Sequence, residues 1–465
     1  MGITLTAFAV TIMQSQKFHS LLIRLVVITM KPRQNPRLRN ISLTTVSLVA
    51  LFLCVCLTDS LRAEVPKESS TSSQSWTRFR GPNGTGVIES TNVPLPWSDS
   101  DVRWKIEIPG SGNSSPVLWK DTVYVFTANP TDAARELLAV ELKSGNILWR
   151  QSFPSDPHPL HQRSSYASST PVVDENGVYI AWGVPNNVAV RAFTHDGKKL
   201  WSRDLGRYVS QHGFGTSPII VDGKLIFVNS QDAEELPEGV PPGTSSLIAL
   251  DIATGKTTWE NQRLATRVCY GVPCVIERDG KKLILGAGTR EGFFAIDAAT
   301  GETIWNLPAF DKRIVSSAVM AGKLLISTCG SGGGGNELVA ISTEGEPKEV
   351  FKIQRAAPYV PTPVVANSFI FLWADNGIVT CADASTGKVQ WQERIGGNVS
   401  SSPIIAGDRL IGISEDGVVT ILKAGAQFEK IGEVKLEETI RSTPAATQNE
   451  LIIRTDKHLL CISAK

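Results

Sequence analysis

At residues 251–259 the chain reads Asp-Ile-Ala-Thr-Gly-Lys-Thr-Thr-Trp, and close copies of this pattern stand at residues 297–305 and 383–391. In each copy, glycine forms a tight turn between two β-rich runs, and tryptophan follows four residues later. The same glycine-to-tryptophan spacing is found at Gly145 and Trp149 and at Gly197 and Trp201. A pattern that recurs along a chain in this way indicates a repeat architecture.

A second signature precedes each repeat: two small polar residues, a proline and a β-branched residue. Clear copies begin at Ser114, Ser169, Thr216 and Ser401, and looser copies contain Val272, Ser316, Thr362 and Ser442. Successive copies lie 40 to 55 residues apart. A period near this length, with four short β-runs in each repeat, is typical of a propeller blade. The sequence therefore predicts an all-β fold, an eight-bladed β-propeller with four-stranded antiparallel blades.

The two ends of the repeat region complement each other. The eighth repeat contains only three predicted strands, whereas residues 101–108 contain a tryptophan strand with no blade before it. We therefore predict that residues 102–108 form the outer strand of the last blade, which closes the ring and pairs its edges. Large flat side chains fill wedge-shaped gaps well. The tryptophans expected between blades are Trp104, Trp149, Trp201, Trp259, Trp305 and Trp391.

The N-terminal region has the layout of a secretory signal. An apolar run at residues 41–57 follows a basic stretch that contains Lys31 and Arg39. We predict a signal region at residues 1–63, with cleavage near Ala63 and Met30 as a possible true start. The alternative is an uncleaved membrane anchor, although the run is shorter than the roughly 20 apolar residues of a spanning helix. We expect a periplasmic or secreted protein.

Charge excludes some partners. Of the 46 Lys and Arg and 45 Asp and Glu, seven cations and one anion lie in residues 1–63, which leaves 39 and 44 and a net charge of −5. Such a mildly acidic chain has no electrostatic reason to bind nucleic acid or anionic lipid. We expect residues 64–100 to be a leader and N-terminal segment, and residues 101–465 to be a monomeric propeller without a membrane segment once the signal is cleaved.

Five cysteines follow residue 63, and an odd number leaves at least one thiol unpaired. Cys381 and Cys461 each end a β-rich run, so we expect both to be buried as small apolar residues. Cys269 and Cys274 are five residues apart and would form a disulfide only across a tight turn.

The paired signatures resemble the pyrroloquinoline-quinone-like (PQQ-like) repeat, and residues 101–465 resemble the secreted eight-bladed propellers built from it. The segment Trp76-Thr-Arg-Phe-Arg-Gly-Pro-Asn-Gly-Thr-Gly86 resembles a group common in planctomycete-type bacteria. The same repeat is similar to that of two better understood classes, the quinoprotein alcohol dehydrogenases and the BamB-type outer-membrane assembly scaffolds.

The resemblance leaves three functions open. It implies first an exported, non-catalytic scaffold without a cofactor, and second a dehydrogenase that binds PQQ with calcium. Such dehydrogenases have an adjacent cysteine pair, a calcium site of Glu, Asn and Asp, and a catalytic Asp. This chain contains no adjacent cysteine pair, which favours the scaffold over an enzyme. The third possibility is a structural module of the cell envelope.

The long loops indicate where a ligand would bind. In a four-stranded antiparallel blade, the loop after the fourth strand and the loop between the second and third strands open on one face. Long loops at residues 152–165, 206–215, 231–245, 330–336 and 355–360 all fall on that face. Variable loops on a rigid scaffold commonly carry binding sites. We therefore predict that a protein, peptide or glycan of the cell envelope binds there.

The predicted binding face is rich in cations and aromatic side chains. Its candidate residues are His161, Arg163, Tyr166, His212, Arg267, Tyr270, Arg313, Arg355, Tyr359 and Arg441. Together they would form a rim suited to a carboxylate, a phosphate or an acidic peptide. The alternative is that these arginines bond only to carbonyl groups and neighbouring acids.

Motifs for other chemistry are weak. His158 and His161 offer two imidazoles, but no carboxylate or cysteine cluster completes a metal site. Gly255-Lys-Thr257 resembles the end of a phosphate-binding loop, but Leu250 stands where that loop needs glycine. We expect neither a metal site nor catalytic residues.

Overall fold

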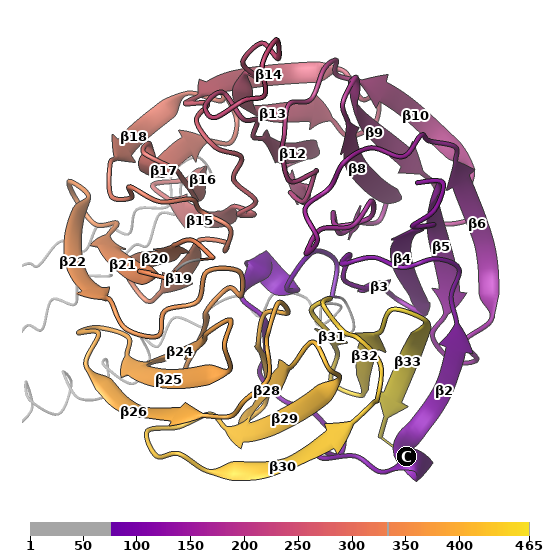
Figure 1. Ribbon diagram of the computed structural model, residues 1–465, viewed down its shortest axis with the longest axis vertical. Helices are drawn as coiled ribbons and strands as arrows, with labels where there is room; N and C mark the ends of the chain where they lie inside the picture. Colours follow the sequence, from indigo (N-terminus) through magenta and orange to yellow (C-terminus); the bar gives the residue numbers. More distant parts are fainter. Residues whose placement is uncertain (1–75, 333, 465) are drawn as a thin grey trace, which may run out of the picture. The chain divides into compact units, whose positions relative to one another are not determined.

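Eight antiparallel sheets follow one another along the chain and surround a central axis, as Figure 1 shows. The computed structural model describes residues 76–332 and 334–464, and the predicted signal region lies outside them. The predicted all-β, eight-bladed propeller is confirmed. Within the described residues, no helix is long and apolar enough to span a membrane.

Each blade begins with a short inner strand beside the axis and ends with an outer strand at the circumference. Blade 1 consists of β3 (Val117–Trp119), β4 (Thr122–Ala128), β5 (Arg135–Glu141) and β6 (Ile147–Phe153). Blade 2 consists of β7 (Val172–Val173), β8 (Val178–Val184), β9 (Asn187–Phe193) and β10 (Lys199–Asp204). Blade 3 consists of β11 (Ile219–Val221), β12 (Lys224–Asn229), β13 (Ser245–Asp251) and β14 (Thr257–Arg263). Blade 4 consists of β15 (Cys274–Arg278), β16 (Lys281–Gly288), β17 (Gly292–Asp297) and β18 (Thr303–Leu307).

The second half of the ring continues this order. Blade 5 consists of β19 (Val319–Ala321), β20 (Leu324–Cys329), β21 (Glu337–Ser342) and β22 (Lys348–Ile353). Blade 6 consists of β23 (Val364–Ala366), β24 (Phe369–Trp373), β25 (Ile378–Asp383) and β26 (Val389–Arg394). Blade 7 consists of β27 (Ile404–Ala406), β28 (Arg409–Ile413), β29 (Val418–Lys423) and β30 (Lys430–Lys435), with β1 (Val87–Ile88) added in parallel beside β27. Blade 8 contains β31 (Ala445–Ala446), β32 (Glu450–Arg454) and β33 (His458–Ser463).

The fourth strand of blade 8 is β2 (Val102–Glu107), from the other end of the propeller. It pairs antiparallel with β33, so that Trp104 lies opposite Cys461. Glu438 supports this junction, because its carboxylate contacts Lys105 of β2 at 2.6 Å and His458 of β33 at 2.9 Å. The short helices η1 (Pro82–Gly84) and η2 (Asp99–Asp101) are the remaining described elements.

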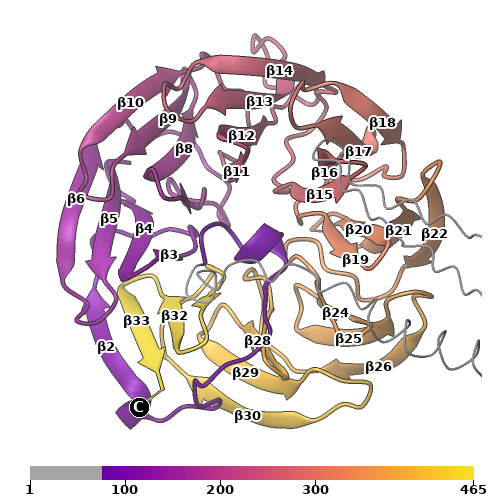
Figure 2. The same ribbon diagram turned by 180° about the vertical axis from the view of Figure 1, so that it is seen from behind.

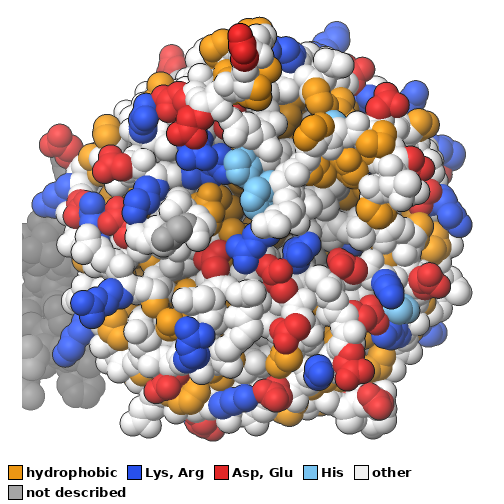
Figure 3. Space-filling model, in the orientation of Figure 1, with side chains coloured by type: hydrophobic (Ala, Val, Ile, Leu, Met, Phe, Trp, Pro, Cys, Tyr) orange, Lys and Arg blue, Asp and Glu red, His pale blue; other side chains and the backbone are white. Residues whose placement is uncertain are grey.

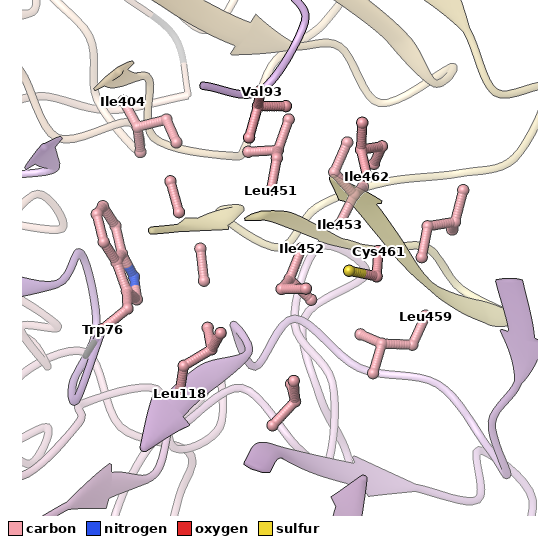
Figure 4. Packing of buried hydrophobic residues seen from close by; sticks show 14 of the residues in the cluster. Trp76, Val93, Leu118, Ile404, Leu451, Ile452, Ile453, Leu459, Cys461 and Ile462 are labelled. Atoms are coloured by element: carbon pink, nitrogen blue, oxygen red, sulfur yellow. The ribbon is translucent and has the colours of Figure 1, made fainter. Parts of the chain in front are cut away.

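The core lies between the faces of neighbouring sheets. Figure 4 shows part of one cluster, in which Trp76 and Leu118 lie near Ile452 and Ile404. The inner three strands of a blade are mostly buried, whereas the outer strands are largely exposed. All five cysteines of the described residues are buried free thiols, so the burial predicted for Cys381 and Cys461 is confirmed and no disulfide joins Cys269 to Cys274.

Tryptophans of the outer strands contact the turn of the next blade. Trp201 of β10, for example, donates its indole N–H to the carbonyl of Ile252, at a distance of 2.9 Å. The corresponding indole bonds run from Trp104 to Leu142, from Trp149 to His195, from Trp259 to Ala298 and from Trp391 to Gly425. Trp305 is half-buried beside the cluster formed by blades 4 and 5. In blade 5, Phe351 takes the equivalent register position and lies against Gly387.

Candidate ligand-binding channel

A ring of hydroxyl groups surrounds the axis where the inner strands begin. The second residue of each Ser/Thr–Ser/Thr–Pro signature accepts a hydrogen bond from the backbone N–H of the equivalent residue in the preceding blade. The seven bonds run from Ser115 to Thr170, Thr170 to Ser217, Val272 to Ser317, Ser317 to Thr362, Thr362 to Ser402, Ser402 to Thr443 and Thr443 to Ser115. Among the described residues the ring is open only between Ser217 and Val272, because valine has no hydroxyl. The signature therefore links neighbouring blades, in addition to marking where each inner strand begins.

A segment ahead of the propeller, residues 76–88, closes the channel from the short-turn side, and we call it the plug. Its backbone bonds to blades 1, 2 and 7, through the N–H groups of Leu118, Val173 and Ile405. These partners lie three residues beyond the hydroxyl ring along the inner strands, towards the short turns. In Figures 1 and 2 the indigo plug lies at the centre of the ring of blades.

Arg80 fixes the plug in place. It is fully buried, and its guanidinium donates to the carbonyls of Thr362, Pro363 and Pro403 at 3.2, 2.8 and 2.9 Å. Burial lowers the pKa of Arg80 to about 9. Because a buried charge is costly unless its hydrogen bonds are satisfied, these carbonyls tie the plug to blades 6 and 7.

The channel opens as a cup at the centre of the long-loop face. The cavity has a volume of about 540 Å³ and contains Phe79 of the plug among its lining residues. Figure 3 shows this hollow, with histidine and Arg or Lys side chains gathered beside it. The hydroxyl ring contributes Ser217, Ser317 and Thr362 to the lining. The plug therefore turns an open channel into a closed cup.

Eight of the ten predicted binding residues line this cup. They are His161, Arg163, His212, Arg267, Tyr270, Arg313, Tyr359 and Arg441. The other two lie elsewhere. Tyr166 packs under the guanidinium of Arg135 and donates its hydroxyl to the carbonyl of His158, and Arg355 is exposed outside the cup lining.

Most cations of the cup have carboxylate partners, which makes the rim less positive than the sequence predicts. Arg163 lies 3.7 Å from Asp375 and 3.5 Å from Glu415, and Arg441 lies 3.3 Å from the same Glu415. On the opposite wall Arg267 lies 3.5 Å from Glu235. The predicted alternative of arginines bonded to neighbouring acids therefore describes these three residues.

Arg313 is different from these arginines. Only 7% of its surface is exposed, and it has no ion pair with any carboxylate of the described residues. One guanidinium nitrogen lies 3.4 Å from Nδ1 of His212. Burial and the neighbouring charge of Arg313 lower the pKa of His212 to about 4, so this imidazole is neutral at pH 7 and accepts the hydrogen bond.

Two aromatic hydroxyls lie in the same region of the cup. Burial raises the pKa of Tyr359, and the charge of Arg313 together with a hydrogen bond to it opposes that effect. Tyr270 donates its hydroxyl to the carbonyl of Gly213 at 3.1 Å. His161 stacks on His212 with ring centroids 4.9 Å apart. This part of the cup presents one buried cation among aromatic rings.

Sequence reasoning missed the floor of the cup. Phe79 and Arg80 belong to residues 64–100, for which the sequence predicts a leader and N-terminal segment, and the Ser/Thr pairs of the ring predict only where strands begin. The signal was present as the dense run of Trp, Arg and Phe at residues 76–80, which is unusual for a solvated leader.

The donor groups of the cup do not fit the calcium and PQQ of a quinoprotein dehydrogenase. Among the described residues, no group of three or more His, Cys, Asp or Glu side chains is arranged to hold a metal ion. Of the carboxylates in the cup lining, Glu235 is engaged by Arg267 and Glu234 by Arg290.

The protein is a propeller of the PQQ-like repeat class. It has the eight blades, the indole and hydroxyl bonds between blades, and the closed cup described above. The chain belongs to the family described as outer membrane protein assembly factor BamB, whose profile matches residues 96–261, 167–356 and 294–427. The protein of that name from Burkholderia pseudomallei (strain K96243) is 22% identical over 324 residues, which is 65% of this chain and 73% of that protein.

Solved structures show the same fold. The crystal structure of BamB from Moraxella catarrhalis superposes with a TM-score of 0.55 at 16% identity, covering 77% of this chain and 96% of that one. A europium-containing methanol dehydrogenase superposes with a TM-score of 0.62 at 13% identity, covering 82% and 90%. At these identities the likeness extends to the fold and not to the activity.

Proposed function

We propose that this protein is an exported, non-catalytic scaffold that binds a partner protein of the cell envelope, with a segment of the partner entering the cup. The observation that carries this proposal is the cup itself, a cavity of about 540 Å³ at the centre of the long-loop face, with Phe79 of the plug in its lining. Relatives of the same family are named outer membrane protein assembly factors, which favours a protein over a glycan as the partner.

The size of the cup supports this kind of binding. Pockets of roughly 300 to 1,000 Å³ enclose ligands of the size of a few residues, not folded domains. Stable protein interfaces bury about 800 Å² on each partner, so the long loops around the cup would supply the remaining contact area. A rigid ring of blades would hold these loops in place.

The proposal is tested by filling the cup. Val360 lines the cup, whereas Val350 is 45% exposed on the outer strand β22. The full chain, Val360→Trp and Val350→Trp are each immobilised and exposed to envelope extract of the source organism, and the retained proteins and glycans are quantified by mass spectrometry. We expect Val360→Trp to lose at least tenfold of a retained protein that Val350→Trp still holds.

Three other results contradict the proposal. If Val360→Trp retains the same proteins at the same level, the cup is not the binding site. Loss in both variants points to the outer strands or to misfolding, and loss of a glycan alone makes the partner a sugar chain. Thermal unfolding of each variant separates misfolding from a local effect.

A further inference from the structure

We propose that the cup recognises a carboxylate attached to an apolar or aromatic body, with Arg313 as the residue that binds the carboxylate. This inference rests on the proposed function, because it specifies which chemical group of a partner enters the cup. The same group is present at the C-terminus of a peptide and in a free small acid.

The burial of Arg313 is the first observation that supports binding of a carboxylate. Only 7% of the residue is exposed, it is part of the cup lining, and it has no ion pair with a carboxylate of the described residues. A buried cation without a counterion is costly, and arginines in protein interiors are normally paired. A carboxylate in the cup would supply the counterion that Arg313 lacks, since charge-assisted bonds between a guanidinium and a carboxylate are strong.

The charge balance of the cup supports a single negative charge. Arg163 and Arg441 share Asp375 and Glu415, and Arg267 contacts Glu235. At the rim, Arg290 lies 2.6 Å from Glu234, while Asp311 and Lys312 are exposed neighbours. Among the arginines of the cup lining, Arg313 thus remains as the buried one without an ion pair in the described residues, and its single charge matches a carboxylate better than a phosphate dianion.

The hydroxyl ring adds further donors. Ser317 and Thr362 line the cup, and each hydroxyl oxygen accepts one backbone N–H. A hydroxyl that accepts a bond still has its own O–H to donate. No contact within the described residues uses these two O–H groups as donors, so they remain for a ligand or for water.

The rest of the cup suits an apolar or aromatic body. Phe79, Tyr270 and Val360 lie in its lining, and the neutral His212 stacks on His161. Aromatic side chains attract flat apolar groups through area burial and ring contacts. A carboxylate beside an aromatic side chain, as at a C-terminal phenylalanine, satisfies both features.

Isothermal titration calorimetry with the full chain tests this inference. The probes are N-acetylphenylalanine, the pentapeptide Gly-Gly-Gly-Gly-Phe with a free C-terminus, and the C-terminal amide of each. The variants are Arg313→Gln and the control Arg355→Gln, which removes an exposed arginine outside the cup. We expect each acid to bind at least tenfold more tightly than its amide, because the amide loses the charge-assisted bond.

The two variants test whether Arg313 is the residue that binds the carboxylate. Arg313→Gln should abolish the preference for acid over amide, and Arg355→Gln should keep it. The acid and amide comparison in the unaltered chain holds even if Arg313→Gln fails to fold. Equal affinity of the two acids identifies a free small acid as sufficient, and tighter binding of the peptide identifies a chain terminus.

Other outcomes overturn the inference. They are equal binding of acid and amide, and no binding of either acid. Failure of the inference is distinguishable from failure of the proposed function. If the acids do not bind but Val360→Trp still loses its partner, the scaffold function stands and the carboxylate assignment falls. If the acids bind but Val360→Trp keeps its partner, the proposed function falls.

Discussion

The α-carbon of Gly255 lies against the indole ring of Trp201 in the preceding blade. A methyl group on Gly255 would lie 2.6 Å from Cε3 of that ring, and the residue has a φ of +70°. The glycine therefore meets two requirements at once: a left-handed turn and the close approach of two blades. The spacing of glycine and tryptophan within one repeat thus reports a contact between consecutive blades.

Gly255→Ala should reduce the free energy of unfolding by about 2 to 4 kcal/mol, from the positive φ together with overpacking. The matched control is Gly223→Ala in the same blade, which has a φ of +68° and no atom within 4 Å of the added methyl. That control should cost only about 1 kcal/mol. Urea unfolding measures both, and equal costs would show that the indole contact contributes nothing.

Two substitutions in the hydroxyl ring should change the stability of the propeller in ways that test the bonds between blades. Ser402→Ala leaves the buried N–H of Thr362 without its acceptor and should cost about 1 to 3 kcal/mol. Val272→Thr supplies the hydroxyl that the ring lacks, so it should cost less than Val319→Thr on β19, a buried position without such a role. A larger cost for Val272→Thr than for Val319→Thr in thermal unfolding would contradict the account of the ring.

Arg80→Met should release the plug. The carbonyls of Thr362, Pro363 and Pro403 lose their donor, and we expect a loss of about 2 to 4 kcal/mol, together with faster hydrogen exchange at residues 76–88. Arg394→Met, on the exposed face of β26, is the control and should leave exchange at the plug unchanged. Unchanged exchange in Arg80→Met would show that the plug is held by other contacts.

Glu438 gives the junction of β2 and β33 a pH dependence. Burial raises the pKa of Glu438, but the bonds with Lys105, Thr455 and His458 together outweigh it and lower the pKa from 4.5 to about 2. The stabilisation is therefore complete above about pH 4.5 and is lost as the pH falls towards 2.

As the pH falls from about 4.5 towards 2, the melting temperature of the unaltered chain should fall more steeply than that of Glu438→Gln. The neighbouring exposed residue provides the control, Glu437→Gln, which should follow the unaltered chain. Parallel curves for all three proteins would mean that this carboxylate does not stabilise the junction.

The fold could be predicted from the sequence because its signals are local and repeated. The glycine turn and the tryptophan of the following strand lie within one stretch of nine residues, as in residues 251–259. Their spacing can therefore be recognised in the sequence itself. Eight of the ten candidate residues line the cup for the same reason, since blade topology alone assigns them to one face.

The features that the sequence did not predict depend on contacts between distant residues. Arg80 bonds to Pro403, 323 residues away, and nothing periodic connects the two. Arg163 meets Asp375 only because the ring brings blades 1 and 6 to a common axis. Arg313 is buried without an ion pair among the described residues, a property of its surroundings in the folded ring that no local sequence pattern records.

The cup on the long-loop face is the proposed site of contact with the partner. The most direct measurement places the photo-crosslinking residue p-benzoylphenylalanine in the full chain, either at Tyr359 in the cup or at Lys256 on the opposite, short-turn face. After irradiation in the native envelope, the account predicts a discrete protein adduct from position 359 and none from position 256. An adduct from position 256 alone, or equal adducts from both positions, would contradict it.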